Sequence, residues 1–188
     1  MIRVFNITLF LIFASLLLTG CFNNEQITEE LIEYHNDEWR KLQEIKKENS
    51  GPILTEYYTL ALNENDQGIE KLLREEFLPL QKEVVEHLEE IYLESKEVEK
   101  LNQLQLEAEK FGYEILKEQA DIIHGGNLIE IDEMYERFNQ YQKELEEKYA
   151  EVEEKREKLM EKYDVELIKE TDEKGNNVMK MVRKEERD

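Results

Sequence analysis

Apolar residues recur every three or four positions along most of this chain, and this spacing constrains the fold more than any other feature. Between Ile69 and about Ile123 the series contains Leu73, Phe77, Leu80, Val84, Leu88, Ile91, Val98, Leu101, Ala108, Ile115 and Ile122. Such steps return a side chain to the same face of an α-helix, whereas a strand needs a step of two. Charged residues make up 38% of the chain, which holds only seven glycines and two prolines to interrupt helices. The pattern predicts long amphipathic helices that pack along their apolar faces.

Two turn-forming stretches divide this helical pattern. They are "NENDQG" at residues 63–68 and "HGGN" at residues 124–127, both rich in residues that favour turns. The chain therefore contains three predicted helical units, residues 28–64, 69–123 and 128–163. Because short connections place consecutive helices antiparallel, the sequence predicts an all-α fold, an elongated antiparallel three-helix, coiled-coil-like bundle.

Smaller signals refine these units. Thr28 is followed by two glutamates and suits a helix start, because its hydroxyl can accept hydrogen bonds from open backbone amides. "NSGP" at residues 49–52 predicts a stop or kink, and Pro79 predicts a second kink. The polar residues around 94–97 predict a bend, and the stripe of the third unit places Leu145 in the core.

The N-terminus has the pattern of an export signal. Arg3 precedes an apolar run from Ile7 to Leu18, which is shorter than the roughly 20 residues of a membrane span. The next residues resemble the lipobox of bacterial lipoproteins, whose members here are Leu18, Thr19, Gly20 and Cys21. This resemblance implies cleavage before Cys21 and a diacylglyceryl group on its thiol, which is the only thiol in the chain.

The predicted organisation has four parts. Residues 1–20 form a lipoprotein signal peptide, residues 21–27 a lipidated tether, and residues 28–165 the helical bundle. The tail, residues 166–188, has a glycine-asparagine turn between two short apolar runs. It is compatible with a hairpin, a helix extension or a disordered end, since a lone hairpin is marginal in water. Two or more acyl chains anchor a protein stably, so we expect location at the cell membrane, on its extracytoplasmic face.

The charge of the chain limits its partners. Asp and Glu outnumber Lys and Arg by 46 to 25, for a formal net charge of −21. Nucleic-acid affinity comes largely from Lys and Arg contacts to phosphate, so neither nucleic acids nor bare anionic wall polymers are expected ligands. The acidity indicates a solvated surface in preference to an acidic recognition patch.

No stretch of the sequence predicts catalysis or metal binding. "NENDQGIEKLLR" resembles part of a calcium loop, but its twelfth position is Arg74 where the loop needs a bidentate glutamate. None of the three histidines has a glutamate three residues before it, as a di-iron bundle requires. We expect no catalytic, metal or cofactor site, and a protein that is not an enzyme.

Aromatic residues are the remaining candidates for recognition. Trp39, Tyr57 and Tyr58 are predicted partner contacts, although each also suits a helical core. Tyr135, Tyr149 and Tyr163 share one heptad position, where they would either stack on glycans or flank the core with their hydroxyls reaching water. The second interpretation is favoured.

A lipobox followed by a Glu- and Lys-rich helical body resembles the cell-wall-binding lipoproteins of Gram-positive bacilli. The resemblance implies a membrane-anchored, non-catalytic binding or spacer module that contacts a cell-wall component or an envelope protein. Two alternatives remain, an accessory subunit of a membrane transporter or envelope enzyme, and a structural protein that self-associates as a homo-oligomer.

Overall fold

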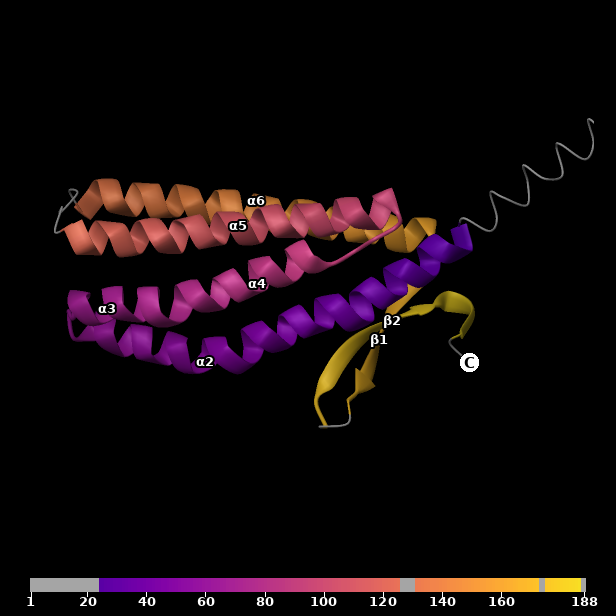
Figure 1. Ribbon diagram of the computed structural model, residues 1–188, viewed down its shortest axis with the longest axis horizontal. Helices are drawn as coiled ribbons and strands as arrows, with labels where there is room; N and C mark the ends of the chain where they lie inside the picture. The colour runs from indigo at the N-terminus through magenta and orange to yellow at the C-terminus, as the bar shows by residue number, and fades with distance from the viewer. Residues whose placement is uncertain (1–23, 126–130, 173–174, 187–188) are drawn as a thin grey trace, which may run out of the picture.

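The protein is built from four helical arms and a small β-hairpin (Figure 1). The computed structural model describes residues 24–125, 131–172 and 175–186. The first arm, residues 24–62, includes the π-helix η1 (Tyr34–Trp39) and α2 (Arg40–Leu62). The second arm comprises α3 (Asp66–Leu72), the π-helix η2 (Leu73–Phe77) and α4 (Leu78–Glu90), and α5 (Lys96–Gly125) and α6 (Ile131–Lys162) are the third and fourth arms. Consecutive arms run antiparallel (Figure 1).

The predominantly helical fold is confirmed, but the expected single helix over residues 69–123 is wrong. The chain leaves helical geometry after Glu90, and residues 91–95 connect α4 to α5, so the described residues form four arms where three were expected. Ser95 caps α5, since its Oγ accepts hydrogen bonds from the backbone amides of Glu97 and Val98 at 3.2 and 3.4 Å. Reversal at this point lets the apolar faces of α4 and α5 cover each other.

Three local expectations also changed. Thr28 does not start a helix, because it lies inside one and its hydroxyl donates to the carbonyl of Asn24 at 2.8 Å. Residues 49–52 do not stop the helix, because Pro52 lies inside α2, which continues through it. Pro79 stands at the start of α4, directly after η2, and there the Leu78 amide bonds to the carbonyl of Leu73. The wider π-helical turn accommodates the missing amide proton of proline.

The C-terminal tail forms a hairpin. Strands β1 (Val165–Thr171) and β2 (Asn177–Arg183) pair antiparallel, and the short helix η3 (Lys184–Glu186) follows. Gly175 occupies the turn with a φ of 82°, which favours glycine. The hairpin gains stability by packing on the first arm, where the Asn36 side chain bonds to both the amide and the carbonyl of Met181 at 2.8 and 2.9 Å.

Buried apolar side chains form separate clusters along the bundle. The hairpin-end core contains Leu31, Tyr34, Val98, Leu101, Val152, Leu159, Tyr163, Val165 and Met181. A middle cluster contains Leu42, Val84 and Leu88. The distal core, near the turn between the first and second arms, contains Ile69, Leu73 and Ala120. The hairpin end is therefore the larger packed unit, and it holds both ends of the described chain together.

Candidate functional site

A groove of about 760 Å³ lies between the first arm and the connector that follows α4. One wall is the helix of residues 26–41, and the other is formed by His87 and residues 90–95. Ile27, Ile91 and Leu93 supply apolar surface, because these side chains are only partly covered by the hairpin-end core. We call this feature the connector groove.

Acidic side chains dominate the lining of the connector groove. Seven of its sixteen lining residues are acidic, and they are Glu29, Glu30, Glu33, Asp37, Glu38, Glu90 and Glu94. Lys41 and His87 are the basic residues among the sixteen. A concave surface lined by one sign of charge concentrates the potential and attracts the opposite charge. The groove is thus suited to a cationic group that also presents apolar surface.

Two of these carboxylates have structural roles. Glu30 accepts hydrogen bonds from the backbone amides of Glu94 and Ser95 at 2.5 and 2.9 Å, which holds the connector against the first arm. Glu38 lies 3.2 Å from Nε2 of His87, and this contact joins the first and second arms. These two carboxylates therefore hold the walls of the groove together and also contribute to its negative charge.

The acidic wall coincides with an irregular part of the helix. The π-helix η1 spans Tyr34–Trp39, in the middle of this wall. Single π-helical turns inside α-helices occur frequently at functional sites. In η1, Tyr34 and His35 are buried, whereas Asp37 is exposed and lines the groove.

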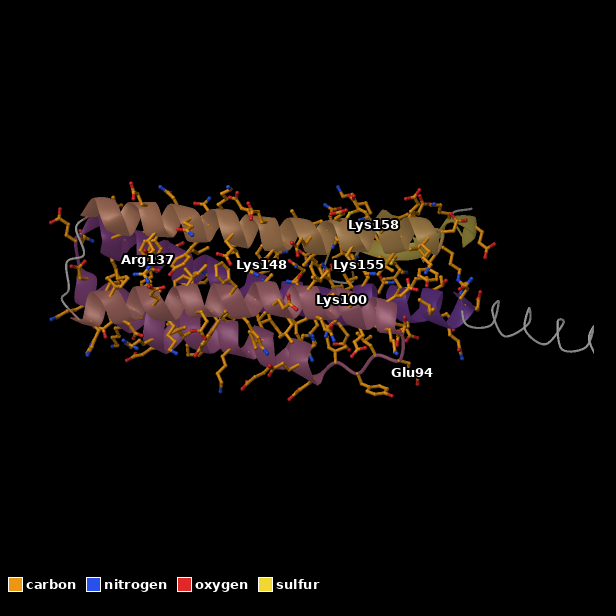
Figure 2. The ribbon with its side chains drawn as sticks, turned by 90° about the horizontal axis from the view of Figure 1, so that it is seen from above. Glu94, Lys100, Arg137, Lys148, Lys155 and Lys158 are labelled. Carbon is orange, nitrogen blue, oxygen red and sulfur yellow. The ribbon has the colours of Figure 1, made fainter. Side chains whose placement is uncertain are left out.

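Basic side chains are concentrated elsewhere. Figure 2 shows Lys100, Lys148 and Lys155 along the seam between α5 and α6, and Glu94 at the connector. Several bases on that side have partners, since the Arg137 guanidinium lies 2.5 Å from a carboxylate oxygen of Glu118 and Lys148 lies over the ring of Phe111. In the groove itself, Glu29 lies 3.7 Å from Arg183 and Glu38 lies 3.2 Å from His87. The remaining carboxylates of the lining are the ones available to a cationic ligand.

The predicted aromatic contacts fall in different environments. Trp39 is half-buried, with the guanidinium of Arg156 5.2 Å from its ring centroid. Tyr57 packs edge-on against Phe77, whereas Tyr58 is 64% exposed. These three residues do not line the groove. The sequence did not single out Tyr92, which lines it and is 84% exposed.

The tyrosines of the heptad position do not form an exposed stripe among the described side chains. Tyr163 is buried, and Tyr149 is half-buried with its hydroxyl donating to Glu109 at 3.1 Å. The expectation that this hydroxyl reaches water is therefore wrong. Burial and the nearby carboxylate raise the pKa of Tyr149 above its usual value. The side chain of Tyr135 lies outside the described residues.

A buried polar layer crosses the middle of the bundle, with Glu109 at its centre. The Glu109 carboxylate is 2.5 Å from Nζ of Lys46 and accepts a bond from Gln81 at 2.8 Å. Gln105 and Tyr149 also donate to it, so all four arms contribute. Buried charges need such partners, and among the described residues only one polar atom of this layer, Oε1 of Gln105, has no hydrogen-bond partner.

The lipobox residues Leu18, Thr19, Gly20 and Cys21 lie outside the described residues. Within the described part of the chain, no helix is long and apolar enough to cross a membrane. Among the same residues, no group of three His, Cys, Asp or Glu side chains is placed to hold a metal ion. In the former calcium-loop candidate, Asn65 caps α3 by accepting a bond from the Gly68 amide at 3.0 Å.

No protein-family model, curated protein or solved structure matches this chain. Helical bundles serve many unrelated functions, so fold alone does not identify one. The chemistry of the connector groove and the N-terminal sequence therefore provide the basis for a functional proposal.

Proposed function

We propose that this chain is a lipoprotein anchored through Cys21 on the extracytoplasmic face of the cell membrane, where it acts as a non-catalytic binding module. The observation that carries the proposal is the connector groove, a concave surface that combines carboxylates with exposed apolar side chains. Binding sites are typically concave, and charged groups placed in them select the ligand. The groove begins at Gln26, only a few residues after Cys21 in the sequence.

The lipobox sequence supports the anchor. A diacylated cysteine gives stable membrane attachment, since each buried methylene contributes about 0.8 kcal/mol and two chains suffice. The charge of −21 keeps the body of the protein away from anionic lipid. A tethered protein of this kind would meet partners that lie close to the membrane surface, including envelope proteins and wall components that carry positive charge.

Cell fractionation tests the anchor. Cells expressing the full chain should retain it in the membrane fraction, and Cys21→Ala should either leave it uncleaved or release it to the medium. Retention of a correctly cleaved but unacylated Cys21→Ala protein at the membrane would contradict the anchor.

A second experiment tests the absence of catalysis. The purified protein should release no fragments when it is incubated with isolated cell walls. Hydrolysis of wall glycan or peptide by the protein alone would overturn the proposal of a non-catalytic module.

Self-association is a second candidate function, favoured by one observation. Leu54, Tyr58 and Leu62 follow one another at four-residue steps on α2 and are 42%, 64% and 85% exposed. Such a row resembles the seam of helix pairs. Sedimentation of the purified protein, with Tyr58→Glu as the comparison, distinguishes a dimer through this row from a monomer.

A further inference from the structure

We propose that the connector groove binds an extended protein segment in which basic and apolar residues alternate. This inference rests on the proposed binding function and specifies the chemistry of the partner. It is carried by the charges of one wall, their spacing, and the apolar surface opposite them.

The first step concerns the unmatched carboxylates. Glu33, Asp37 and Glu90 line the groove and are exposed, and within the described residues none of them forms an ion pair or side-chain hydrogen bond. Several like charges around one concavity repel one another and raise the local attraction for cations. A ligand with several positive charges relieves this repulsion and gains from each carboxylate in turn.

The second step concerns spacing. Glu29, Glu33 and Asp37 follow one another at four-residue steps along the helical wall, and all three line the groove. Glu29 also lies 3.7 Å from Arg183, which is closer to Glu25. An α-helix rises about 1.5 Å per residue, so Glu29 and Glu33 start about 6 Å apart. The wider turn of η1 lies between Glu33 and Asp37. In an extended chain, alternate residues lie on one side with a separation of about 6.6 Å. Lysines or arginines at alternate positions would therefore match this row of carboxylates.

The third step concerns the remaining residues of such a segment. Because successive side chains of an extended chain point to opposite sides, the residues between the bases would face the other wall. That wall presents Ile91, Tyr92 and Leu93, of which Tyr92 is 84% exposed. Apolar residues at these positions would cover this surface. The pattern expected of the partner is thus basic, apolar, basic, apolar.

The same geometry disfavours other occupants. A second copy of this chain, with a net charge of −21, would be repelled by the acidic wall. A single metal ion needs ligands that converge on one point, whereas the row of carboxylates extends along the helix. A flexible polyamine would match the charges but leave the apolar wall uncovered, so it should bind more weakly.

Isothermal titration calorimetry on the purified protein in mild detergent tests the proposal. The probes are a short synthetic peptide of alternating lysine and leucine, the same peptide with glutamine in place of lysine, the same peptide with serine in place of leucine, and spermine. The lysine–leucine peptide should bind, with an affinity that falls as salt increases. The serine peptide and spermine should each bind at least about tenfold more weakly, and the glutamine peptide should not bind measurably.

Matched variants separate a specific site from general acidity. Glu33→Gln, Asp37→Asn and Glu90→Gln together should weaken the lysine–leucine peptide at least about tenfold. The control combines Glu144→Gln, Glu151→Gln and Glu157→Gln on α6, which remove the same charge from exposed residues outside the groove. The control should bind like the unmodified protein, and circular dichroism should show both variants folded.

Three outcomes overturn the inference. Equal weakening by both triple variants would show that net charge alone attracts the peptide. Equal affinity for spermine or for the serine peptide would show that the apolar wall is not used. If the lysine–leucine peptide does not bind, the proposed partner with alternating basic and apolar residues is refuted. The membrane anchor is tested separately by the fractionation experiment.

Discussion

The two ends of the bundle differ in how they are closed. At the hairpin end, buried side chains come from the first arm, α5, α6 and both strands. At the distal end the buried cluster consists of Ile69, Leu73 and Ala120, from the second arm and α5. The distal part of α2 leaves Tyr58 and Leu62 exposed.

This difference shows where the stability of the fold is concentrated. Leu31 and Met181 are both fully buried in the hairpin-end core, although most of the chain separates them. The hairpin end therefore forms only when both ends of the described chain are in place. Regions with fewer buried contacts open at lower free energy than the core. We expect the distal end to open first, while the hairpin end unfolds with the whole molecule.

The largest expected effect comes from matched leucine truncations at the two ends. Leu31 and Leu73 are both 0% exposed, and Leu→Ala at buried sites costs about 2–5 kcal/mol. Leu31→Ala should lie in the upper half of this range, about 4 kcal/mol, because five segments pack around that core. Leu73→Ala should cost about 2 kcal/mol, since its surroundings can relax more easily. Urea unfolding of the purified proteins measures both values.

Hydrogen exchange provides the control for this comparison. In the unmodified protein, the amides of α3 should exchange faster than those at the start of α5. Leu73→Ala should accelerate exchange in α3 more than near Val98. Equal protection at both ends, or a larger loss of stability for Leu73→Ala, would contradict the difference between them.

The polar layer around Glu109 separates the two ends, and removing its centre has the next largest effect. Glu109→Ala would leave Lys46 without its 2.5 Å partner and would remove the acceptor of Gln81 and Tyr149. Breaking a buried ion pair by removing one partner costs about 3–5 kcal/mol, and we expect about 3 kcal/mol because Lys46 is partly exposed.

The double variant Lys46→Met, Glu109→Leu is the control for that layer. It removes both charges, so its loss of stability in urea unfolding should be smaller than that of Glu109→Ala. If the double variant is less stable than Glu109→Ala, the polar layer stabilises the fold through packing and not through the pairing of its charges.

Low pH should lower the stability of the fold through His35, which is buried near the hairpin. His35 is 5% exposed. Burial, together with the nearby positive charge of Arg156, lowers its pKa from 6.5 to about 4. A hydrogen bond with the backbone of Met179 acts in the opposite direction and raises the pKa. Between these values the unfolded chain binds the proton and the folded protein does not, so stability decreases as pH falls from about 6.5 towards 4. This shift corresponds to a loss of up to roughly 3 kcal/mol.

The measurement is the free energy of unfolding in urea between neutral pH and pH 5. His35→Gln cannot titrate and should flatten the dependence. An unaltered slope in His35→Gln would assign the pH dependence to other groups.

Local sequence signals predicted the helical content and the turn at residues 63–68, whereas the turn predicted at residues 124–127 lies partly outside the described residues. They predicted a bend near residues 94–97, but not the full reversal at residues 91–95. Ser95, followed by Glu97 and Glu99, is a recognisable helix start, yet the surrounding residues contain no glycine or proline. The connector is held by Glu30, which is 64 and 65 residues away from the two amides it binds. Spacing within one segment cannot predict such a partner. The connector groove was missed for the same reason.

Helical periodicity also did not predict how deeply each residue of the apolar stripe is buried. The stripe of α6 treats Leu145 and Leu159 alike, but Leu145 is only half-buried while Leu159 is 2% exposed. The difference arises because Leu159 lies in the hairpin-end core, where the first arm and the hairpin cover it, whereas Leu145 belongs to none of the buried clusters. Periodicity identifies the face of a helix, and the neighbours decide how deeply each residue is buried.

The smallest expected effect is at the exposed row of the distal end. Leu62 is 85% exposed at the end of α2, so Leu62→Gln removes little buried area and should change the free energy of unfolding by less than about 0.5 kcal/mol. Because the fold gains little from this leucine, a larger loss would mean that another surface covers it in solution. Repeating the urea unfolding at several protein concentrations distinguishes these cases. Stability independent of concentration indicates an uncovered row, and stability that rises with concentration indicates that two copies meet there, which would make the distal end as closed as the hairpin end.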